Sequence, residues 1–537
     1  MGSITGGPEV SVRVLAMCVA NSARSQMAEG WLRALSVPSL EVWSAGSAPT
    51  SPRPEALAVM AEVGVDLRGH RSKSAAEVPV PDVVATLCAE EVCPVYPGDV
   101  ERLDWGVPDP AAVQGSLEER LEAFRVARDA IRAKVEVFLV ARGLRHTFAS
   151  ARGDFLLDPT VTFLNHGSFG ATPRSVLEAR HALSVRFESQ PVDYVRSVLP
   201  SALRHAAERV ATWLGAPGDE LGFVDNATAG TAAVLRSLEL RPGDVLLTTD
   251  HAYGAVRRLL EYVCDRTGAR VHVVHVPFPV ARPSDVVQAV ADDFPEGVKL
   301  AIFDHITSIT GLVLPVAELV ALCRERGVPT LIDGAHAPGQ AVFDLGAIGA
   351  DFWTGNLHKW AFAPKGCAVL HVRREWHDRV HPLAISHFYR QGFAQELDWQ
   401  GTRDFATWLA CEAGLDQAER WGGWDRIRVH NVDLRRAASD VITRRLGLAD
   451  PIPLPMLAAL QTFRHGPGTQ ADADAISARL LREHRVEAMF MAFGDDVWFR
   501  ISPQLHNHLD QYERLAGLLQ GAGAAGAGAA GAGAGVG

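Results

Sequence analysis

A cysteine and an arginine near the start of the chain have a spacing that could support nucleophilic chemistry. Cys18 and Arg24 frame a five-residue loop, which follows the apolar run 12–17 and precedes a helical pattern. Backbone N–H groups of such a loop can bind a tetrahedral oxyanion, and the guanidinium can grip two of its oxygens. The same environment stabilises Cys18 as a thiolate. We expect Asn21 and Ser22 to contact the anion. The alternative is a buried structural cysteine beside an incidental arginine.

Three further residues could take part in this chemistry. Asp109, in a loop before Pro110, could protonate a departing oxygen, although Asp-Pro is also a common turn. Cys88 and Cys93 lie close together, which suggests a thiol relay or a metal site. No matching second pair exists, so we expect no zinc or other metal.

A carboxylate and a lysine in the second half of the chain suggest a different chemistry. Asp333 ends the apolar run 329–332, and a ligand of an open α/β sheet lies at the carboxyl ends of its strands. A buried aspartate there would suit a cationic partner. Lys359, between His358 and Trp360, is a candidate Schiff-base nucleophile. Taken singly, the lysine could equally lie on the surface and the aspartate could cap a helix.

Small residues that follow the apolar run 221–224 could hold a phosphate group at a helix start, namely Asn226, Ala227 and Thr228. In chain order, the sequence then provides a phosphate cradle, a partner for a cation and an amine. Together these are the parts of a site for an aldehyde phosphate.

Alternating strand and helix patterns position both sets of residues in α/β domains. The first domain is expected over residues 11–143, and its last helix starts at a capping box formed by Ser116 and Glu119. Residues 144–154 read as a linker. Apolar runs at 245–248, 271–276, 300–303 and 329–332 predict a parallel sheet with helices on both faces.

This large domain is expected over residues 155–405, with the N-terminal segment of a small domain included. The pattern from 406 to 520 is mostly helical with a late strand at 497–501, which predicts a smaller C-terminal α/β domain. Residues 521–537 are almost pure Gly and Ala, and we expect them to be a disordered tail.

Composition narrows the class of protein. The net charge of −11 argues against a general nucleic-acid binder, because no basic excess is available to neutralise phosphates. No apolar run approaches the ~20 residues needed to cross a bilayer. The start lacks the layout of a signal peptide, and seven scattered cysteines are not a disulfide framework. These features predict a cytoplasmic protein without membrane contact.

Residues 12 to about 142 resemble the thioredoxin-coupled arsenate reductases, which share the low-molecular-weight tyrosine phosphatase fold. The resemblance is carried by 18–29, 44–49, 69–74, the cysteine pair and the stretch from 105 to 110. Phosphatases of this fold carry tyrosines after the Asp-Pro, whereas Ala111 and Ala112 follow here, which favours the reductase. An arsenate- or phosphate-like oxyanion is the implied substrate.

The arsenate-reductase resemblance implies a relay of thiols. Cys18 attacks arsenate with Asp109 as the acid, and Cys88 then attacks Cys18 as arsenite leaves. Cys93 forms a disulfide with Cys88, and thioredoxin or another thiol reductant reduces that bond.

Residues 155 to 520 resemble the class V aminotransferases, which depend on pyridoxal phosphate (PLP). The nearest branch is the isopenicillin N epimerase-like and cysteine-desulfurase-like one. The matching stretches are 165–170, 250–254, 333–336, 358–359, 401–404 and 500–502 with Asn507. The implied fold is a large α/β domain of PLP fold type I with a smaller C-terminal α/β domain.

The class V resemblance also implies residue roles. Lys359 would bind the cofactor and move the Cα proton of an amino-acid substrate, and Asp333 would pair with the ring nitrogen. His336 would bind the ring hydroxyl, and His251 or Tyr253 would stack on the ring. The residues placed near the phosphate are Thr228, Asn356, His358 and, from the neighbouring subunit of a homodimer, Thr402. The residues placed near the substrate are Arg500, which would hold its carboxylate, and Ser308.

One departure affects the predicted reaction. A persulfide-forming desulfurase needs a cysteine on a mobile loop after the lysine, and the expected loop, 463–468, has none. Cys367 reads as a strand residue and Cys411 as part of an apolar helix. Epimerase, transaminase and β-lyase chemistry remain open.

The sequence therefore predicts a bifunctional fusion of an arsenate reductase and a PLP enzyme, with arsenic detoxification or thiol metabolism as the link. An alternative is an oxyanion phosphatase fused to a carbon–sulfur lyase. A third is that one module serves only as a binding or regulatory unit. The intact sets Cys18/Arg24/Asp109 and Asp333/Lys359 argue against that third alternative.

Overall fold

The computed structural model describes residues 12–89, 96–148 and 151–531, without the side chains of 521–531. The chain forms two compact units. Unit 1 comprises the residues up to Ala149 together with Glu419–His430, and unit 2 comprises the remainder. In the described residues, no helix is both long and apolar enough to span a membrane.

Unit 1 is built on a four-stranded parallel sheet in the order β2-β1-β3-β4. The strands are β1 (Arg13–Cys18), β2 (Glu41–Gly46), β3 (Val83–Cys88) and β4 (Glu101–Val107). Because β1 and β3 are parallel neighbours, Cys18 and Cys88 end adjacent strands at the same edge of the sheet. The expected parallel sheet is confirmed.

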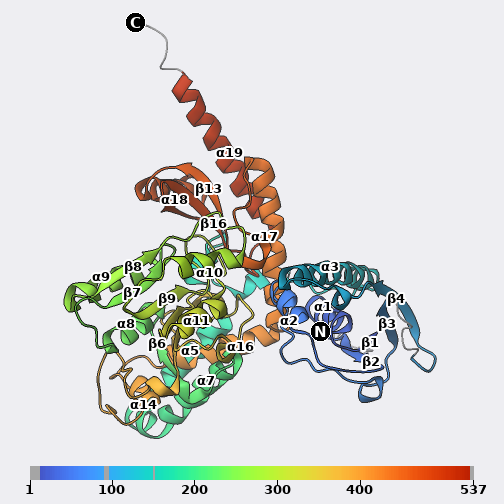
Figure 1. Ribbon diagram of the computed structural model, residues 1–537, viewed down its shortest axis with the longest axis horizontal. Coiled ribbons are helices and arrows are strands. Elements are labelled where there is room, and N and C mark those ends of the chain that lie inside the picture. Colours follow the sequence, from blue (N-terminus) through green and yellow to red (C-terminus); the bar gives the residue numbers. More distant parts are fainter. Residues whose placement is uncertain (1–11, 90–95, 149–150, 532–537) are drawn as a thin grey trace, which may run out of the picture. The chain divides into compact units, whose positions relative to one another are not determined.

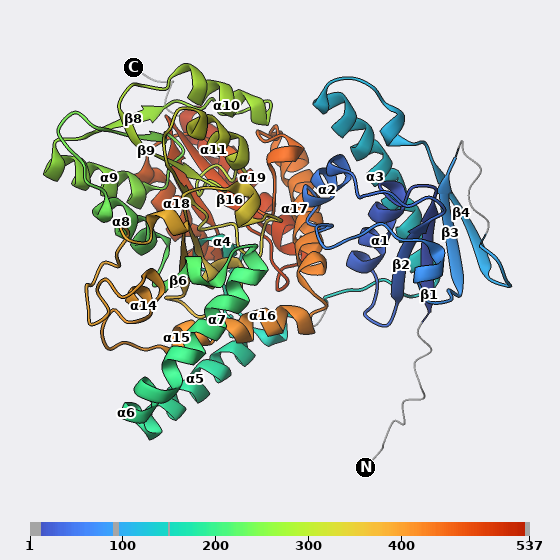
Figure 2. The ribbon, with the colours of Figure 1, turned by 60° about the horizontal axis from the view of Figure 1, so that its bottom comes forward.

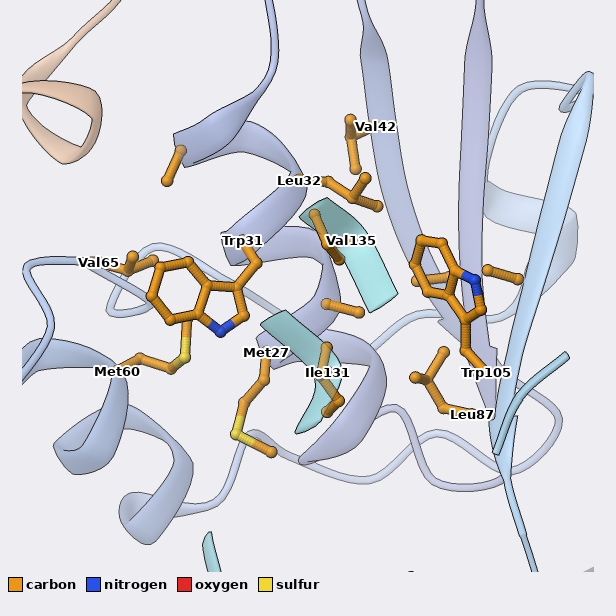
Figure 3. Packing of buried hydrophobic residues seen from close by; sticks show 14 of the residues in the cluster. Met27, Trp31, Leu32, Val42, Met60, Val65, Leu87, Trp105, Ile131 and Val135 are labelled. Carbon is orange, nitrogen blue, oxygen red and sulfur yellow. The ribbon is translucent and has the colours of Figure 1, made fainter. Parts of the chain in front are cut away.

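Three helices cover one face of this sheet, namely α1 (Arg24–Leu35), α2 (Pro54–Ala61) and α3 (Leu117–Ala141) (Figure 1). Figure 3 shows the core between them, where Trp31 of α1 lies near Met60 and Val65, and Ile131 and Val135 of α3 approach the sheet. The indole N–H of Trp31 donates to the carbonyl of Arg128 at 3.2 Å. The largest buried side chain of unit 1 therefore ties α1 to α3.

Helix α3 begins as the sequence predicts. The hydroxyl of Ser116 accepts from the N–H of Glu119, and the Glu119 carboxylate accepts from the N–H of Ser116 at 2.7 Å. The segment expected to be a linker starts differently. The carbonyl of Leu144 accepts from the N–H of Val37 at 2.8 Å, and the N–H of His146 donates to the carbonyl of Leu35. Residues 144–146 therefore belong to unit 1, where backbone hydrogen bonds pair them with residues 35–37 in a short antiparallel bridge.

Unit 2 contains a seven-stranded sheet in the order β6-β12-β11-β10-β9-β7-β8. Its strands are β6 (Leu221–Val224), β7 (Val245–Thr249), β8 (Arg270–Val274), β9 (Val298–Asp304), β10 (Thr330–Asp333), β11 (Phe352–Asn356) and β12 (Ala368–Val372). Strand β12 is antiparallel to both of its neighbours. It departs from the expected parallel pattern because the short connection after β11 can return only to an antiparallel neighbour.

Helices flank this sheet and connect its strands (Figure 2). The helices before β6 are α4 (His166–Phe169), α5 (Arg174–Ser189), α6 (Pro191–Asp193) and α7 (Leu199–Leu214). Those between β6 and β12 are α8 (Ala227–Ser237), α9 (Gly254–Thr267), α10 (Pro283–Asp292), α11 (Val316–Glu325), α12 (Leu345–Ile348) and α13 (Leu357–Trp360). Those after β12 are α14 (Phe393–Asp398), α15 (Ala406–Leu409) and α16 (Cys411–Arg420).

A small antiparallel sheet of β13 (Gln461–Pro467), β16 (Asp496–Ile501) and β15 (Met489–Phe493) lies in the C-terminal region. Its core also includes residues of α17 (Trp424–Leu446), α18 (Gln470–His484) and α19 (Leu509–Gly531) (Figure 1). A minor two-stranded parallel pair joins β5 (Thr162–Phe163) to β14 (Val486–Glu487). The expected small C-terminal domain is confirmed.

Two expectations for the C-terminal region differ from the structure. The stretch 463–467, expected to be a loop, belongs to β13, where the ring of Phe463 stacks on that of Phe499. It is a strand because its backbone pairs antiparallel with β16, with a register shift between Arg464 and Gly466. Helix α19 continues to Gly531 through part of the segment expected to be disordered. Alanine has the highest helix propensity, so a helix that starts in a packed segment can extend there.

Candidate active sites

The cysteine of unit 1 lies at the point where β1 meets the loop before α1. Cys18 is buried, and its Sγ is 3.0 Å from the hydroxyl oxygen of Ser25. A thiolate can only accept a hydrogen bond, so Ser25 is the donor whenever Cys18 is ionised. The sequence interpretation did not single out Ser25, although it is the second residue of a helix that follows a nucleophile.

Asn21 fixes the shape of this loop. Its backbone has a φ of 45°, a left-handed conformation that asparagine tolerates better than most residues. Its side-chain amide donates to the hydroxyls of Ser25 and Ser44, both at 2.9 Å, and its side-chain oxygen accepts from the N–H of Lys73 at 2.8 Å. All of these bonds face the protein, so the structure places Asn21 as a loop support. Ser22 is also buried.

The expected acid and the arginine lie together. The Arg24 guanidinium is 3.6 Å from a carboxylate oxygen of Asp109 and donates to the carbonyl of Val107 at 3.1 Å. Asp109 is partly exposed and accepts from the N–H of Ala111. The structure therefore brings Cys18, Arg24 and Asp109 to one edge of the sheet.

The cysteines expected to form the relay can be followed only in part. Cys88 ends β3, is buried and belongs to the same hydrophobic cluster as Cys18. Cys93 lies outside the described residues.

A buried ion pair supports the anion loop from behind. The Nζ of Lys73 is 3.2 Å from a carboxylate oxygen of Glu29, which also accepts from the hydroxyl of Ser44 at 2.5 Å. The neighbouring His70 and these two donors outweigh burial and lower the pKa of Glu29. Ser44 also receives a bond from Asn21, so the ion pair is linked to the loop.

Most of the predicted cofactor residues of unit 2 line one cavity of about 480 Å³ at the carboxyl ends of the strands, and His251 and Thr402 do not. Asp333 ends β10, and Lys359 lies in α13, which directly follows β11. Asp333 is buried and Lys359 is partly buried. Burial lowers the pKa of Lys359 to about 8 and raises the pKa of Asp333. A lysine with such a pKa is partly neutral near physiological pH, which is the form that attacks a carbonyl.

The backbone of the Lys359 turn is held on two sides. The carbonyl of Cys367 accepts from the N–H groups of Leu357 and His358. The carbonyl of Lys359 accepts from the imidazole of His166 at 3.0 Å. Gly170, at a φ of +72°, lies so close that a Cβ there would be 2.5 Å from that same carbonyl oxygen. Only glycine fits this approach.

Asp304 is a second buried carboxyl group of the cavity that the sequence interpretation missed. It ends β9 and pairs in register with Asp333 on the adjacent strand. Burial first, and then the charge of Asp333, raises its pKa well above the usual value. The sequence did contain a signal for Asp304. It directly follows the apolar run 300–303, just as Asp333 directly follows the run 329–332.

The N-terminus of α8 forms the predicted phosphate end of the cavity. Asn226 caps the helix by accepting from the N–H of Ala229 at 2.9 Å. Asn356 accepts from the N–H of Ala227 at 2.9 Å, which ties the end of β11 to the helix start. Thr228 and His358 also line this end.

Arg500, in β16, is a buried cation beside the cavity. Its guanidinium donates to the carbonyl of Ser308 and, at 3.3 Å, to the hydroxyl of Ser168. Across the described part of the chain, no carboxylate lies within ion-pair distance of it. Both serines line the cavity, so the predicted substrate residues Arg500 and Ser308 lie together and Ser168 joins them.

One predicted contact is placed differently from the first expectation. His251 is 1% exposed and does not line the cavity, because its two ring nitrogens bind the hydroxyl of Thr310 and the carbonyl of Val276. Tyr253, the alternative for the stacking position, does line it. Thr402 is exposed and lies outside the lining of this cavity, so its assignment to a neighbouring subunit stays a prediction.

The cavity has what pyridoxal phosphate requires. A buried amine lies close enough to a buried carboxylate for their charges to interact, and a helix N-terminus lies at one end. Such an arrangement defines enzymes that bind an aldehyde cofactor covalently.

The chain belongs to the class V aminotransferase family, whose model matches residues 168–450. It is therefore a PLP-dependent enzyme. Residues 13–147 match the family of low-molecular-weight phosphotyrosine protein phosphatases, so the chain is a fusion of the two.

Relatives of the second part include a putative L-cysteine desulfhydrase of Oryza sativa subsp. japonica, 36% identical over 66% of this chain and 82% of that protein. An isopenicillin N epimerase of Streptomyces clavuligerus is 33% identical over 69% of this chain and 96% of that protein.

Among solved structures, a complex of the cystine C–S lyase C-DES with cysteine persulfide covers 67% of this chain and 98% of its own. It has a TM-score of 0.57 at 20% identity. The apo cysteine desulfurase of Thermococcus onnurineus NA1 has a TM-score of 0.56 at 18% identity, over 69% of this chain and 96% of its own. These similarities confirm the fold of unit 2.

Proposed function

We propose that the chain is a bifunctional enzyme. Unit 2 eliminates sulfide from a cysteine-type amino acid with pyridoxal phosphate, and unit 1 reduces arsenate to arsenite with thiols. The observation that supports the lyase is the cavity lined by Lys359 and Asp333, beside which Arg500 binds two lining serines and no carboxylate of the described residues. The observation that supports the reductase is the loop that places Cys18 beside Ser25 and near Arg24.

In the lyase, Arg500 would hold the carboxylate of the amino acid through a bidentate pair. Asp333 would pair with the ring nitrogen of the cofactor, and the start of α8 would bind its phosphate. Bound pyridoxal phosphate supplies an electron sink that stabilises negative charge at Cα. Lys359, once its amine is free, would take the Cα proton.

The proposed elimination balances as follows. The Cα–H bond breaks, and the Cβ–S bond breaks with its electron pair on sulfur, which leaves as sulfide. Water then hydrolyses the remaining carbon skeleton to pyruvate and ammonia. No cysteine among the described residues lines the cavity, which favours release of free sulfide over a protein persulfide.

The test is incubation of the purified full chain with L-cysteine, with sulfide, pyruvate and the optical purity of the amino acid measured together. Sulfide and pyruvate in equal amounts support the lyase. Lys359→Ala should abolish both, whereas Lys299→Ala, at an exposed position in β9, should leave them unchanged. Racemised cysteine without sulfide would instead favour an epimerase, as the name of the Streptomyces relative suggests.

In the reductase, the Cys18 thiolate would attack arsenic and displace a hydroxyl that Asp109 protonates. Cys88 would attack the Cys18 sulfur, so that arsenite leaves with two electrons. Cys93 would then form a disulfide with Cys88 and free Cys18. Thioredoxin, or another thiol reductant, would reduce that disulfide.

This relay can be tested by arsenate turnover coupled to a thioredoxin system. Cys88→Ser should abolish arsenate turnover but spare slow hydrolysis of a phosphate ester, because only the redox step needs the second thiol. Cys323→Ser is the matched control, since this cysteine of α11 is buried and burial raises its pKa to about 12. Unchanged turnover in Cys88→Ser would reject the relay and favour a phosphatase.

We also propose that unit 2 acts as a homodimer in which Thr402 reaches the cofactor phosphate of the neighbouring subunit. Its exposure and its absence from the cavity of its own subunit support this assignment. Equilibrium sedimentation, together with loss of cofactor affinity in Thr402→Val, is the measurement that tests it.

A further inference from the structure

Two consecutive residues of α13 contact the two nitrogens of a single imidazole. The Nε2 of His336 is 3.1 Å from the Nζ of Lys359, and its Nδ1 is 3.4 Å from the indole Nε1 of Trp360. His336 and Trp360 are both buried. The protonation state of the His336 imidazole therefore depends on these two neighbours and not on solvent.

The direction of one of these bonds is fixed by chemistry. An indole N–H can only donate, so Nδ1 of His336 must accept from Trp360. Burial, with Lys359, Arg500 and His358 as facing groups, lowers the pKa of His336 and keeps the ring neutral. A neutral imidazole carries one proton, which is then on Nε2.

We propose that Trp360 is a positioning residue that fixes His336 in the Nε2–H tautomer, so that His336 presents a hydrogen-bond donor to the cofactor cavity. In the opposite tautomer the Nδ1–H and the indole N–H would face each other, and two buried donors would lack acceptors. This proposal rests on the proposed PLP function of unit 2.

The same tautomer determines what Lys359 can do. When Nε2 of His336 donates, the amine of Lys359 can accept only through its lone pair, that is, only in its neutral form. Asp333 and Asp304 raise the pKa of Lys359, but burial and Arg500 lower it further, and the net value is about 8. With pyridoxal phosphate bound through Lys359, the Nε2–H of His336 would be available to donate to an oxygen of the cofactor.

A second buried tryptophan shows that burial alone does not give an indole N–H a hydrogen-bond acceptor in this core. Trp353 in β11 is also fully buried, yet its indole nitrogen has no hydrogen-bond partner among the described residues. An indole N–H can thus be buried in this core without an acceptor. The bond from Trp360 to His336 is a specific feature of the cofactor cavity.

The direct test is the ¹⁵N spectrum of the histidine-labelled full chain, with and without bound pyridoxal phosphate. The signal of His336 is assigned as the one lost in His336→Gln. We expect a protonated Nε2 and an unprotonated Nδ1. A protonated Nδ1 in the unmutated protein would overturn the proposal, whether or not any variant folds.

The second test uses Trp360→Phe, which removes the N–H and keeps a ring, with Trp353→Phe as the matched control. We expect Trp360→Phe to raise the pH midpoint of the absorbance change of the bound cofactor by about one unit, because loss of a donor to a charged oxygen has that order of effect. Trp353→Phe should leave the midpoint unchanged. An unchanged midpoint and tautomer in Trp360→Phe would contradict the proposal.

The two tests separate the positioning role from the proposed function. If the protein binds pyridoxal phosphate but releases no sulfide from cysteine, the lyase reaction fails and the tautomer assignment stands. If no cofactor binds, the spectrum of the free protein still decides the state of His336.

Discussion

Replacement of Arg500 by methionine should make the protein more stable and at the same time destroy its binding of amino acids. Arg500 is 2% exposed and lacks a carboxylate partner among the described residues. Its described bonds go to the carbonyl and, at 3.5 Å, the hydroxyl of Ser308, and to the hydroxyl of Ser168. A buried charge kept without its counter-ion is expected at a site that receives the counter-ion from a ligand.

The magnitude follows from the pKa of the guanidinium. Burial lowers the pKa of Arg500 from 12.5 to about 10, which corresponds to a cost of about 3 kcal/mol at neutral pH. Arg500 is protonated in both states below pH 10, so the cost is fully present there and shrinks only above that pH. The two shorter hydrogen bonds, to the Ser308 carbonyl and the Ser168 hydroxyl, are lost in the variant and offset about 2 kcal/mol. We therefore expect Arg500→Met to be more stable by about 1 kcal/mol.

The assay is urea unfolding of the cofactor-bound protein without substrate, combined with spectral titration by an amino acid. Loss of a bidentate pair to a carboxylate should weaken amino-acid binding by about 100-fold. Arg435→Met is a matched control, because burial also lowers the pKa of Arg435 to about 10 but its bond goes to Gln461. That variant should bind amino acids normally. An Arg500→Met protein that is less stable by more than about 1 kcal/mol would refute the reasoning, since it would reveal an anionic partner within the protein.

Three further outcomes are expected. Gly170→Ala should lose cofactor affinity by at least about tenfold in an absorbance titration and lower the melting temperature, because the new Cβ would be 2.3 Å from the carbonyl oxygen of His358 at a φ of +72°. Lys73→Met should destabilise unit 1 by about 3 kcal/mol in calorimetry, since it leaves Glu29 buried beside fewer cations. As the pKa of Glu29 is lowered in the folded state, the stability it contributes should be present above about pH 4.5 and be lost as the pH falls through its folded pKa. The rate at which cofactor-free protein takes up pyridoxal phosphate should rise with pH around a midpoint near 8, the pKa of Lys359, and a flat stopped-flow profile would contradict this.

The sequence was sufficient to predict those features that depend only on residues close together in the chain. The capping box at Ser116 and the strand at 221–224 depend on neighbouring residues, and both appear as expected. The edge of a parallel sheet also follows from strand order alone, which is why Asp333 and Lys359 could be assigned to one cavity before the fold was known.

Other features depend on contacts between distant segments and could not be read in this way. The pairing of β12 with β6 joins segments that lie far apart in the sequence. His251 lies outside the cavity because it binds Thr310 and Val276, both of which are far from it in the sequence. The role of residues 463–467 depends on pairing with β16, which a short pattern interrupted by glycine and proline does not reveal.

The cysteines illustrate how burial separates reactive from structural side chains. Burial raises the pKa of Cys323 to about 12, and burial together with the neighbouring Cys411 raises the pKa of Cys367 well above its usual value. Such thiols remain protonated and inert at neutral pH. Cys18, in contrast, ends a strand beside a hydroxyl donor and the start of a helix. Since a sulfur becomes a nucleophile only where donors face it, the thiol chemistry that we propose for unit 1 would start at Cys18, and the proposed lyase reaction of unit 2 would depend on Lys359 and the cofactor.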